Sequence, residues 1–423
     1  MYQGRAVAGP VAVGGCLAPV QDLLRPPGAL AAQTTRHMKG PVDVDSSGTK
    51  VQPDLGAAQV RDGDLAVMAG DLDADLRRMS GRRVLITGGA GFLGYYLVQL
   101  PLAWNDAHPD EPPIGVTVMD NYFRDAPAWL KELQRRPEVD LMVHDVRGPL
   151  PDRMGDFAYI IHAAGIASPT IYRAHPIETM DANINGLRTL LDYARQRLEA
   201  GLEMKGFLFY SSSEIYGDPT PDAIPTPETY RGYVSCTGPR ACYDESKRYG
   251  ETLCVNFAQQ YGIPVTAVRP FNNYGPGMKI TDGRVIADFF RDVLAGRDLV
   301  MLSDGSPTRT FCYVSDAITG YYLALLRGRR GEAYNVGVDG PEISMLGLAE
   351  LVAGLAQDLL GHQVKVVRGH SPETAYLVDN PNRRCPDIAK ARQELQYRPR
   401  VALEEGLRRT LLWYTGNRGG EES

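Results

Sequence analysis

The sequence predicts an α/β fold in which helices cover both faces of a doubly wound parallel sheet. Short apolar runs alternate with longer helical segments from residue 82 to about residue 270, and this alternation is typical of β-α-β units. A glycine cluster at residues 88–94 follows the first apolar run directly. Because such a turn places backbone N–H groups and a helix N-terminus around a phosphate, the cluster indicates a Rossmann-type, dinucleotide-binding sheet.

Bulk composition narrows the possible functions. The chain has 423 residues and a net charge of −6, which allows two domains and argues against a nucleic-acid or membrane surface. Its six cysteines contain no C-x-x-C pair, and its seven histidines contain no H-E-x-x-H spacing. We therefore expect reduced thiols in a cytoplasmic protein, with neither a disulfide framework nor a metal site.

The N-terminal part of the chain differs in composition from the rest. Residues 1–78 are rich in Gly, Pro, Ala and Asp, and Tyr2 is their only aromatic residue. Such a segment buries little apolar surface, so we expect a disordered tail over 1–78 and a short second tail over 418–423. The mildly apolar stretch Ala6–Val20 is interrupted by Gly and Pro, which argues against a signal peptide. Met68 and Met79 are alternative start positions.

The first strand and its glycine turn predict the phosphate-binding site. Gly89, Gly91 and Gly94 satisfy G-x-G-x-x-G, and Gly88 extends the pattern to G-x-x-G-x-x-G. A strand predicted at 116–120 ends in Asp120, at the distance expected for an acid that binds the adenosine ribose. A carboxylate at this position favours NAD because it repels the 2′-phosphate of NADP.

The next elements continue the pattern and define the predicted domains. Further strands are expected at 139–146, 159–165, 206–211 and 265–269, and helices at 128–136, 179–197 and 252–261. Ligands of such sheets bind outside the carboxyl ends of the strands. Beyond residue 270 the pattern loosens, and Gly and Pro become frequent. We therefore predict an NAD-binding Rossmann domain over 79–270 and a smaller C-terminal α/β domain over 271–417 that mainly binds substrate.

Tyr243 and Lys247 form a candidate acid–base pair. They are four residues apart, so on a helix they share a face. A free tyrosine has a pKa of about 10, but a neighbouring ammonium group and an oxidised nicotinamide would both favour the phenolate. Such a base can remove the proton of an alcohol while hydride leaves for NAD. Y-x-x-x-K alone also occurs by chance on helix surfaces. We interpret it as a catalytic pair here because it follows a dinucleotide-binding pattern in the same chain.

A longer motif connects this pair to a known family. Residues 238–248 read GPRACYDESKR and residues 212–219 read SSEIYGDP. Shorter matches lie at 271–272, 282–285, 308–309 and 384–388. On these motifs, over about residues 82 to 415, the chain resembles the extended short-chain dehydrogenase/reductases that act on nucleotide sugars, and among them most the UDP-glucuronate decarboxylases (UDP-xylose synthases).

The resemblance implies a role for particular residues, with NAD as cofactor, UDP-glucuronate as substrate and a homodimer as the assembly. The residues implied to hold NAD are Gly88, Gly91, Phe92, Leu93, Gly94, Asp120, Asn121, Asp145, Val146, Ala163, Ala164, Gly165, Tyr243 and Lys247. Those implied to act on the sugar are Tyr243 as the base, with Lys247, Ser212, Ser213, Glu214 and Arg384. Those implied to bind the substrate are Asn272, Arg284, Arg309 and Arg384.

Alternatives remain within and outside this family. Sugar-nucleotide 4,6-dehydratases carry Asp-Glu where this chain has Ser213-Glu214, so the acid that protonates a departing hydroxyl is absent here. A 4-epimerase is a second alternative, and a non-catalytic NAD-sensing module is a third. The chain also has Gly277, Cys385 and Leu302 where relatives usually have Arg, Lys and Tyr, which leaves uracil selectivity open. The released product is either UDP-xylose or the UDP-4-keto-pentose.

Overall fold

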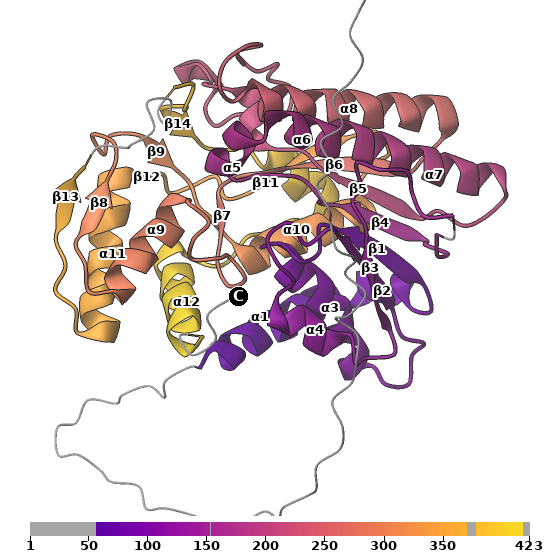
Figure 1. The fold of residues 1–423 in the computed structure, drawn as a ribbon, viewed down its shortest axis with the longest axis horizontal. Coiled ribbons are helices and arrows are strands. Elements are labelled where there is room, and N and C mark those ends of the chain that lie inside the picture. The colour runs from indigo at the N-terminus through magenta and orange to yellow at the C-terminus, as the bar shows by residue number, and fades with distance from the viewer. Residues whose placement is uncertain (1–55, 153, 370–377, 418–423) are drawn as a thin grey trace, which may run out of the picture. The chain divides into compact units, whose positions relative to one another are not determined.

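A seven-stranded parallel sheet forms the centre of the protein (Figure 1). The computed structural model describes residues 56–152, 154–369 and 378–417. The strand order is β11-β6-β5-β4-β1-β2-β3, and every neighbouring pair is parallel. This order confirms the predicted doubly wound sheet. The strands are β1 (Arg83–Thr87), β2 (Gly115–Asp120), β3 (Val139–Val143), β4 (Tyr159–His162), β5 (Gly206–Tyr210), β6 (Val265–Pro270) and β11 (Ala333–Val336).

Helices cover both faces of this sheet because successive strand residues point to opposite sides. Ile86 packs into the cluster with α3 (Gly94–Ala107) and α10 (Val314–Arg327). Its neighbour Leu85 packs into a second cluster, with α7 (Leu187–Glu199) and α8 (Ala241–Tyr261). Apolar residues on both faces explain why the strands read as continuous hydrophobic runs.

Shorter elements connect these layers. The structure contains the helix predicted at 179–197 as α6, one π turn and α7, which follow one another without a break. The one predicted at 252–261 begins earlier, so that α8 carries both Tyr243 and Lys247. The elements not yet given are α4 (Ala128–Leu133), α5 (Pro169–Ala174), α6 (Pro176–Asp181), the π turn Ala182–Gly186, the 3-10 turns Ser213–Tyr216 and Pro221–Ala223, β7 (Asn273–Tyr274), α9 (Val285–Leu294), β8 (Leu299–Met301), β9 (Thr308–Arg309), β10 (Cys312–Tyr313), β12 (Ile343–Ser344), α11 (Met345–Leu360), β13 (Val366–Arg368), β14 (Arg383–Arg384), the π turn Ala391–Leu395 and α12 (Leu403–Gly416).

The predicted N-terminal tail is wrong for its last part. Residues 57–79 form α1 (Ala57–Asp71), α2 (Asp73–Leu76) and a 3-10 turn. Val60, Met68, Leu72 and Leu76 recur at multiples of four residues and are buried, which gives the segment one apolar helical face. Composition averaged over 78 residues concealed this stripe. The predicted tails at 1–55 and 418–423 lie outside the described residues.

A buried carboxylate fastens α1 to the rest of the protein. Asp64 is 3% exposed and accepts hydrogen bonds from the hydroxyls of Tyr96 (2.8 Å) and Tyr313 (2.7 Å). Arg409 donates to its other oxygen at 2.9 Å. These three partners come from α3, the end of β10 and α12, so α1 joins segments that are far apart in sequence.

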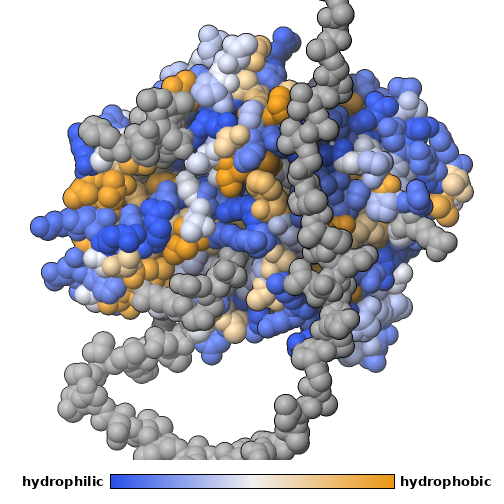
Figure 2. Space-filling view, viewed as in Figure 1, coloured by the Kyte–Doolittle hydropathy of each residue, from blue (hydrophilic) through white to orange (hydrophobic). Residues whose placement is uncertain are grey.

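The C-terminal region divides between two layers. Helix α10 and strand β11 return to the main sheet, so the chain crosses back over the boundary predicted at residue 270. Among the described residues, the remaining strands form the smaller sheets β10-β7, β12-β9-β14 and β13-β8, and α9 and α11 pack against β8. Figure 2 shows hydrophobic residues over this region, where Val300 and Leu346 are exposed. Among the described residues, no helix is long and apolar enough to cross a bilayer.

Candidate active site

A single cavity of about 700 Å³ brings the predicted site residues together at the carboxyl ends of the central strands. One side consists of α8 and the loops that follow β1, β2, β3, β4 and β5. The other consists of segments between residues 270 and 311 together with Met345, Asn380 and Arg384. The lining includes Gly88, Gly91, Phe92, Leu93, Gly94, Asp120, Asn121, Asp145, Val146, Ala163, Ala164, Gly165, Ser212, Ser213, Glu214, Tyr243, Lys247, Asn272, Arg284, Arg309 and Arg384. Their individual roles remain predictions.

The glycine turn has the shape that a dinucleotide phosphate needs. Gly88 has φ +71°, and a Cβ there would lie 2.6 Å from Cα of Ala164. A Cβ at Gly94 would collide with the carbonyl of Gly89. Only glycine fits these positions, and α3 begins at Gly94 with its N-terminus at the turn. The residues present therefore fit NAD.

Asp120 is oriented by the same turn. Its Oδ2 accepts a hydrogen bond from the N–H of Ala90 (3.0 Å), and its Oδ1 accepts one from the N–H of Tyr122 (2.8 Å). Burial raises the pKa of Asp120, while these N–H groups oppose the shift. Asn121 donates to Asp145 at 3.0 Å. A fixed carboxylate at the end of β2 is suited to accept hydrogen bonds from ribose hydroxyls.

The tyrosine–lysine pair lies on one face of α8, as predicted. Lys247 Nζ donates to the carbonyl of Tyr210 at 2.8 Å and lies 5.7 Å from the centre of the Tyr243 ring. Burial lowers the pKa of Lys247 to about 7. It raises the pKa of Tyr243 to about 12, and a hydrogen bond with Ser212 opposes this. In the protein without cofactor, burial therefore outweighs the groups that lower the pKa of Tyr243.

Glu214 is held by two arginines. It follows Ser212, whose hydroxyl accepts a hydrogen bond from the Glu214 N–H at 3.2 Å. Arg384 binds both carboxylate oxygens, at 2.6 and 2.5 Å, and Arg240 binds one of them. Burial alone would raise the pKa of Glu214, but the two guanidinium groups lower it below its usual value. Glu214 is thus a fixed anion that joins the Rossmann domain to β14.

Three residues at this end of the cavity were missed by the sequence analysis. Arg240 lies within the quoted GPRACYDESKR motif but was given no role. Asp244, one helical turn later, is 4% exposed, and its pKa is raised by burial and by Glu214. Tyr172 stacks on Tyr243 with ring centres 5.1 Å apart, and its buried hydroxyl has no hydrogen-bond partner among the described residues. No sequence pattern pointed to Tyr172.

The predicted substrate residues lie on the other side of the cavity. Arg309 is 7% exposed and donates to the carbonyls of Thr308 (2.8 Å) and Asn382 (3.0 Å). Burial and the nearby Arg384 lower the pKa of Arg309 to about 9. A guanidinium group rarely loses its proton, so Arg309 remains charged. We therefore interpret its lowered pKa as a sign of positive charge that lacks a partner, which an anionic ligand would neutralise.

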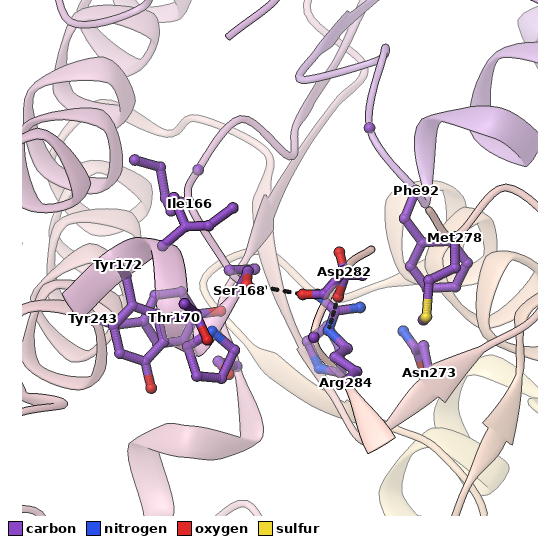
Figure 3. A pocket seen from close by; sticks show the side chains of 18 of the residues that line it. Phe92, Ile166, Ser168, Thr170, Tyr172, Tyr243, Asn273, Met278, Asp282 and Arg284 are labelled. Atoms are coloured by element: carbon purple, nitrogen blue, oxygen red, sulfur yellow. Dashed lines mark hydrogen bonds and ion pairs between the residues drawn. The ribbon is translucent and has the colours of Figure 1, made fainter. Parts of the chain in front are cut away.

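Arg284 and the apolar residues complete this side. Arg284 pairs with Asp282 at 3.1 Å and lies over the Phe92 ring of the glycine turn (Figure 3). Leu302 also lines the cavity. Gly277 has φ +90° and packs against Tyr95, so an arginine at position 277 would not fit this backbone.

Comparisons with known proteins agree with this geometry. Residues 84–337 match the model of the NAD dependent epimerase/dehydratase family. The chain is 39% identical over 325 residues to UDP-glucuronic acid decarboxylase 3 of Arabidopsis thaliana, covering 77% of this chain and 86% of that protein. It is 37% identical over 336 residues to UDP-glucuronic acid decarboxylase 1 of Xenopus tropicalis, covering 79% and 72%.

A solved structure extends the comparison. The dTDP-glucose 4,6-dehydratase of Streptomyces venezuelae, solved with NAD bound, is 29% identical to this chain and superposes with a TM-score of 0.66. The match covers 80% of this chain and 98% of that one. The fold and the cofactor are therefore those of NAD-dependent enzymes that act on sugar nucleotides.

Proposed function

The chain belongs to the NAD-dependent epimerase/dehydratase family, and from this premise we propose that it decarboxylates UDP-glucuronate. In the proposed reaction C4 of the sugar is oxidised, the C6 carboxylate leaves as CO2, and the resulting UDP-4-keto-pentose is reduced to UDP-xylose. Bound NAD supplies the hydride acceptor and donor at C4. The relatives named above carry the same activity in their names.

The observation that carries this proposal is the excess of buried positive charge at the substrate end of the cavity. Arg240, Arg309 and Arg384 are each 6–8% exposed. Among the described residues in contact with them, Glu214 has a lowered pKa, whereas the pKa of neighbouring Asp244 is raised. Buried charge is costly unless it is paired. A substrate that brings both a diphosphate and a sugar carboxylate supplies the missing anions.

The residues around C4 fit both the oxidation and the loss of CO2. Tyr243, with Ser212 beside it, is the group that would take the proton of the 4-hydroxyl. Once C4 is a ketone, the C6 carboxylate belongs to a β-keto acid, and its electrons move towards the C4 oxygen as CO2 departs. Hydrogen bonds from Tyr243 and Ser212 would stabilise the negative charge on that oxygen. Lys247 is held in place by the Tyr210 carbonyl.

Ser213 argues against dehydration. A 4,6-dehydratase needs an acid that protonates the departing 6-hydroxyl, and the buried hydroxyl of Ser213 is too weak for this task. Decarboxylation needs no such acid. The similarity to a dTDP-glucose 4,6-dehydratase and the existence of 4-epimerases in the family keep both reactions as outcomes of the test.

The test is mass analysis of the nucleotides produced from UDP-glucuronate and, separately, from UDP-glucose and dTDP-glucose. We expect a product lighter by one CO2 from UDP-glucuronate alone. Loss of water from a glucose nucleotide, or recovery of UDP-glucuronate at unchanged mass, would contradict the proposal.

Two adjacent arginines of β14 provide a matched pair of variants. Arg384 lines the cavity, whereas Arg383 is outside it and pairs with Glu342. Arg384→Gln should reduce kcat/KM for UDP-glucuronate by about 10² or more, since it removes a charge-assisted pair at the reacting carboxylate. Arg383→Gln should remain near wild type because its ion pair lies outside the cavity and is partly exposed. Equal losses in the two variants would assign Arg384 a structural role.

A further inference from the structure

The loop that follows β2 has a fixed shape. Tyr122 and Asp125 adopt φ values of +53° and +69°, a region that side chains enter only where surrounding contacts impose it. The N–H of Asp125 donates to the carbonyl of Tyr122 at 2.9 Å, and the N–H of Tyr122 donates to Asp120. Arg124, one of the two residues between these strained positions, therefore lies in the loop that directly follows Asp120, the predicted ribose ligand.

Arg124 binds a segment on the other side of the cavity. Its Nη1 lies 2.8 Å from Oδ2 of Asp282, 158 residues later. Lys279, from the same distant segment, donates to the main-chain carbonyl of Arg124 at 2.5 Å. The side chain of Asp282 is 2% exposed, whereas that of Arg124 is 37% exposed. A carboxylate buried to this degree distinguishes the contact from an ordinary surface ion pair.

Asp282 also connects to the third strand of the cofactor site. Its carbonyl accepts a hydrogen bond from the hydroxyl of Ser168 at 3.0 Å (Figure 3). Ser168 lies in the loop that leaves β4, three residues after Gly165. In addition, Arg284 pairs with Asp282 and covers Phe92 of the glycine turn.

These contacts close a ring around the predicted cofactor residues. Strand β1 is hydrogen-bonded to β2 on one side and to β4 on the other. From β2 the ring continues through Arg124 to Asp282, and from there through Ser168 to β4. The glycine turn, Asp120 and residues 163–165 all belong to the enclosed strand ends. Among the described residues, the side of the ring outside the sheet is closed by the two contacts of Asp282 and by the hydrogen bond from Lys279 to the Arg124 carbonyl.

We propose that the Arg124–Asp282 pair retains the cofactor in this ring and thereby determines which product the enzyme releases. A dinucleotide held by residues of β1, β2 and β4 can leave only when the ring opens, and the Arg124–Asp282 pair is its most exposed link. The claim that the pair retains the cofactor depends only on contacts within this chain. The claim about the released product rests on the decarboxylase function proposed above.

The link to the product follows from the electron balance. Conversion of UDP-glucuronate and NAD+ to UDP-4-keto-pentose, CO2 and NADH leaves two electrons on the cofactor. Return of this hydride to C4, with a proton to the oxygen, gives UDP-xylose and restores NAD+. If NADH leaves first, the 4-keto sugar cannot be reduced and is the product. Slow cofactor release therefore favours UDP-xylose, and fast release favours the ketone.

The first measurement needs no turnover. Purified protein carrying bound cofactor is mixed with excess isotopically labelled NAD, and the exchange is followed by mass analysis of the bound nucleotide. Arg124→Ala should release cofactor about tenfold faster than wild type, the effect expected from loss of a hydrogen bond to a charged group. The control is Arg291→Ala, which removes an exposed guanidinium whose ion pairs among the described residues both lie within α9, and this variant should exchange like wild type. Exchange of Arg124→Ala at the wild-type rate would overturn the proposal.

A double-mutant cycle separates the ring from a direct contact between Arg124 and the cofactor. Asp282→Asn alone should also accelerate exchange, and the double variant should be no faster than the faster single variant, because either change opens the same link. Fully additive effects would overturn the proposal. Arg124→Gln, which keeps a hydrogen-bonding side chain without the charge, provides the same readout if the alanine variant fails to fold.

The product measurement distinguishes the two proposals. With UDP-glucuronate, Arg124→Ala should release more ketone, two hydrogens lighter than UDP-xylose, with an equal amount of free NADH. If wild type releases no CO2, the proposed function fails, while the exchange rates still decide whether the Arg124–Asp282 pair retains the cofactor. If Arg124→Ala exchanges faster but its product ratio is unchanged, the product part is wrong.

Discussion

Replacing Met68 by alanine should lower the melting temperature of the protein by about 3–6 °C. Met68 is 1% exposed and lies in α1, within a segment whose composition suggested disorder. Truncation of a fully buried methionine to alanine costs roughly 2–5 kcal/mol. For a protein of this size the unfolding entropy is about 0.8 kcal/mol per kelvin, and dividing the first figure by the second gives the expected shift.

The neighbouring residue supplies the control. Val67 is 58% exposed, so Val67→Ala removes apolar atoms from the solvent-exposed side of the same helix and should shift the melting temperature by less than about 1 °C. The assay is thermal unfolding followed by circular dichroism, at one protein concentration for all variants. Equal melting of Met68→Ala and wild type would refute the packing of α1 described here, as would equal shifts in the two variants.

Truncation tests the same helix as a whole. A chain that begins at Gly56 keeps every contact described for α1, and we expect it to bind NAD. A chain that begins at residue 79 loses Asp64, which leaves the hydroxyls of Tyr96 and Tyr313 and the guanidinium of Arg409 without this partner. Removal of α1 and α2 also exposes to water the core surface that Val60, Met68, Leu72 and Leu76 cover. We expect the shorter chain to be insoluble or to melt well below the longer one.

Four further predictions concern the site, the assembly and the pH dependence. Tyr243→Phe should lower the rate of C4 oxidation by about 10² or more in single-turnover measurements of NADH absorbance, with NAD still bound. Ser213→Asp should weaken binding of UDP-glucuronate in calorimetry without loss of NAD, because a second carboxylate would face that of the substrate. We also expect a homodimer through α6, α7 and α8, where Ile177 and Tyr249 are exposed; Tyr249→Glu should shift sedimentation towards the monomer. Burial lowers the pKa of His162 to about 3. Between about pH 6.5 and 3 the unfolded chain therefore binds a proton at this histidine that the native protein does not. The free energy of unfolding should fall as the pH drops towards 3, and His162→Gln should reduce this slope.

The parts of the fold that sequence could predict are those encoded locally. The apolar run of β1 and the glycines after it specify a strand and a turn within a dozen residues. Tyr243 and Lys247 are one helical turn apart, so their shared face follows from helix geometry alone. In contrast, α1 has an ordinary helical stripe diluted by Gly and Asp, and averaging over a long window concealed it.

The parts that could not be predicted depend on contacts between distant segments. Glu214 and Arg384 are 170 residues apart, and nothing near either residue indicates its partner. Similarly, the stacking of Tyr172 on Tyr243 joins α5 to α8. Resemblance to a family placed Glu214 and Arg384 near the sugar, but the ion pair between them required coordinates, and so did the presence of Arg240 beside it.

This ion-pair cluster also bears on the choice between the reactions of the family. A dehydratase uses its glutamate to remove the C5 proton, and an effective general base has a pKa near the working pH. Here Arg240 and Arg384 lower the pKa of Glu214 below its usual value, which makes it a weak base. Decarboxylation removes no proton from C5, since the carbon–carbon bond supplies the electrons. The arginines that weaken Glu214 as a base are, at the same time, cations beside which a sugar carboxylate can bind. Dehydration would therefore require this cluster to be rearranged, whereas decarboxylation is compatible with it as it stands.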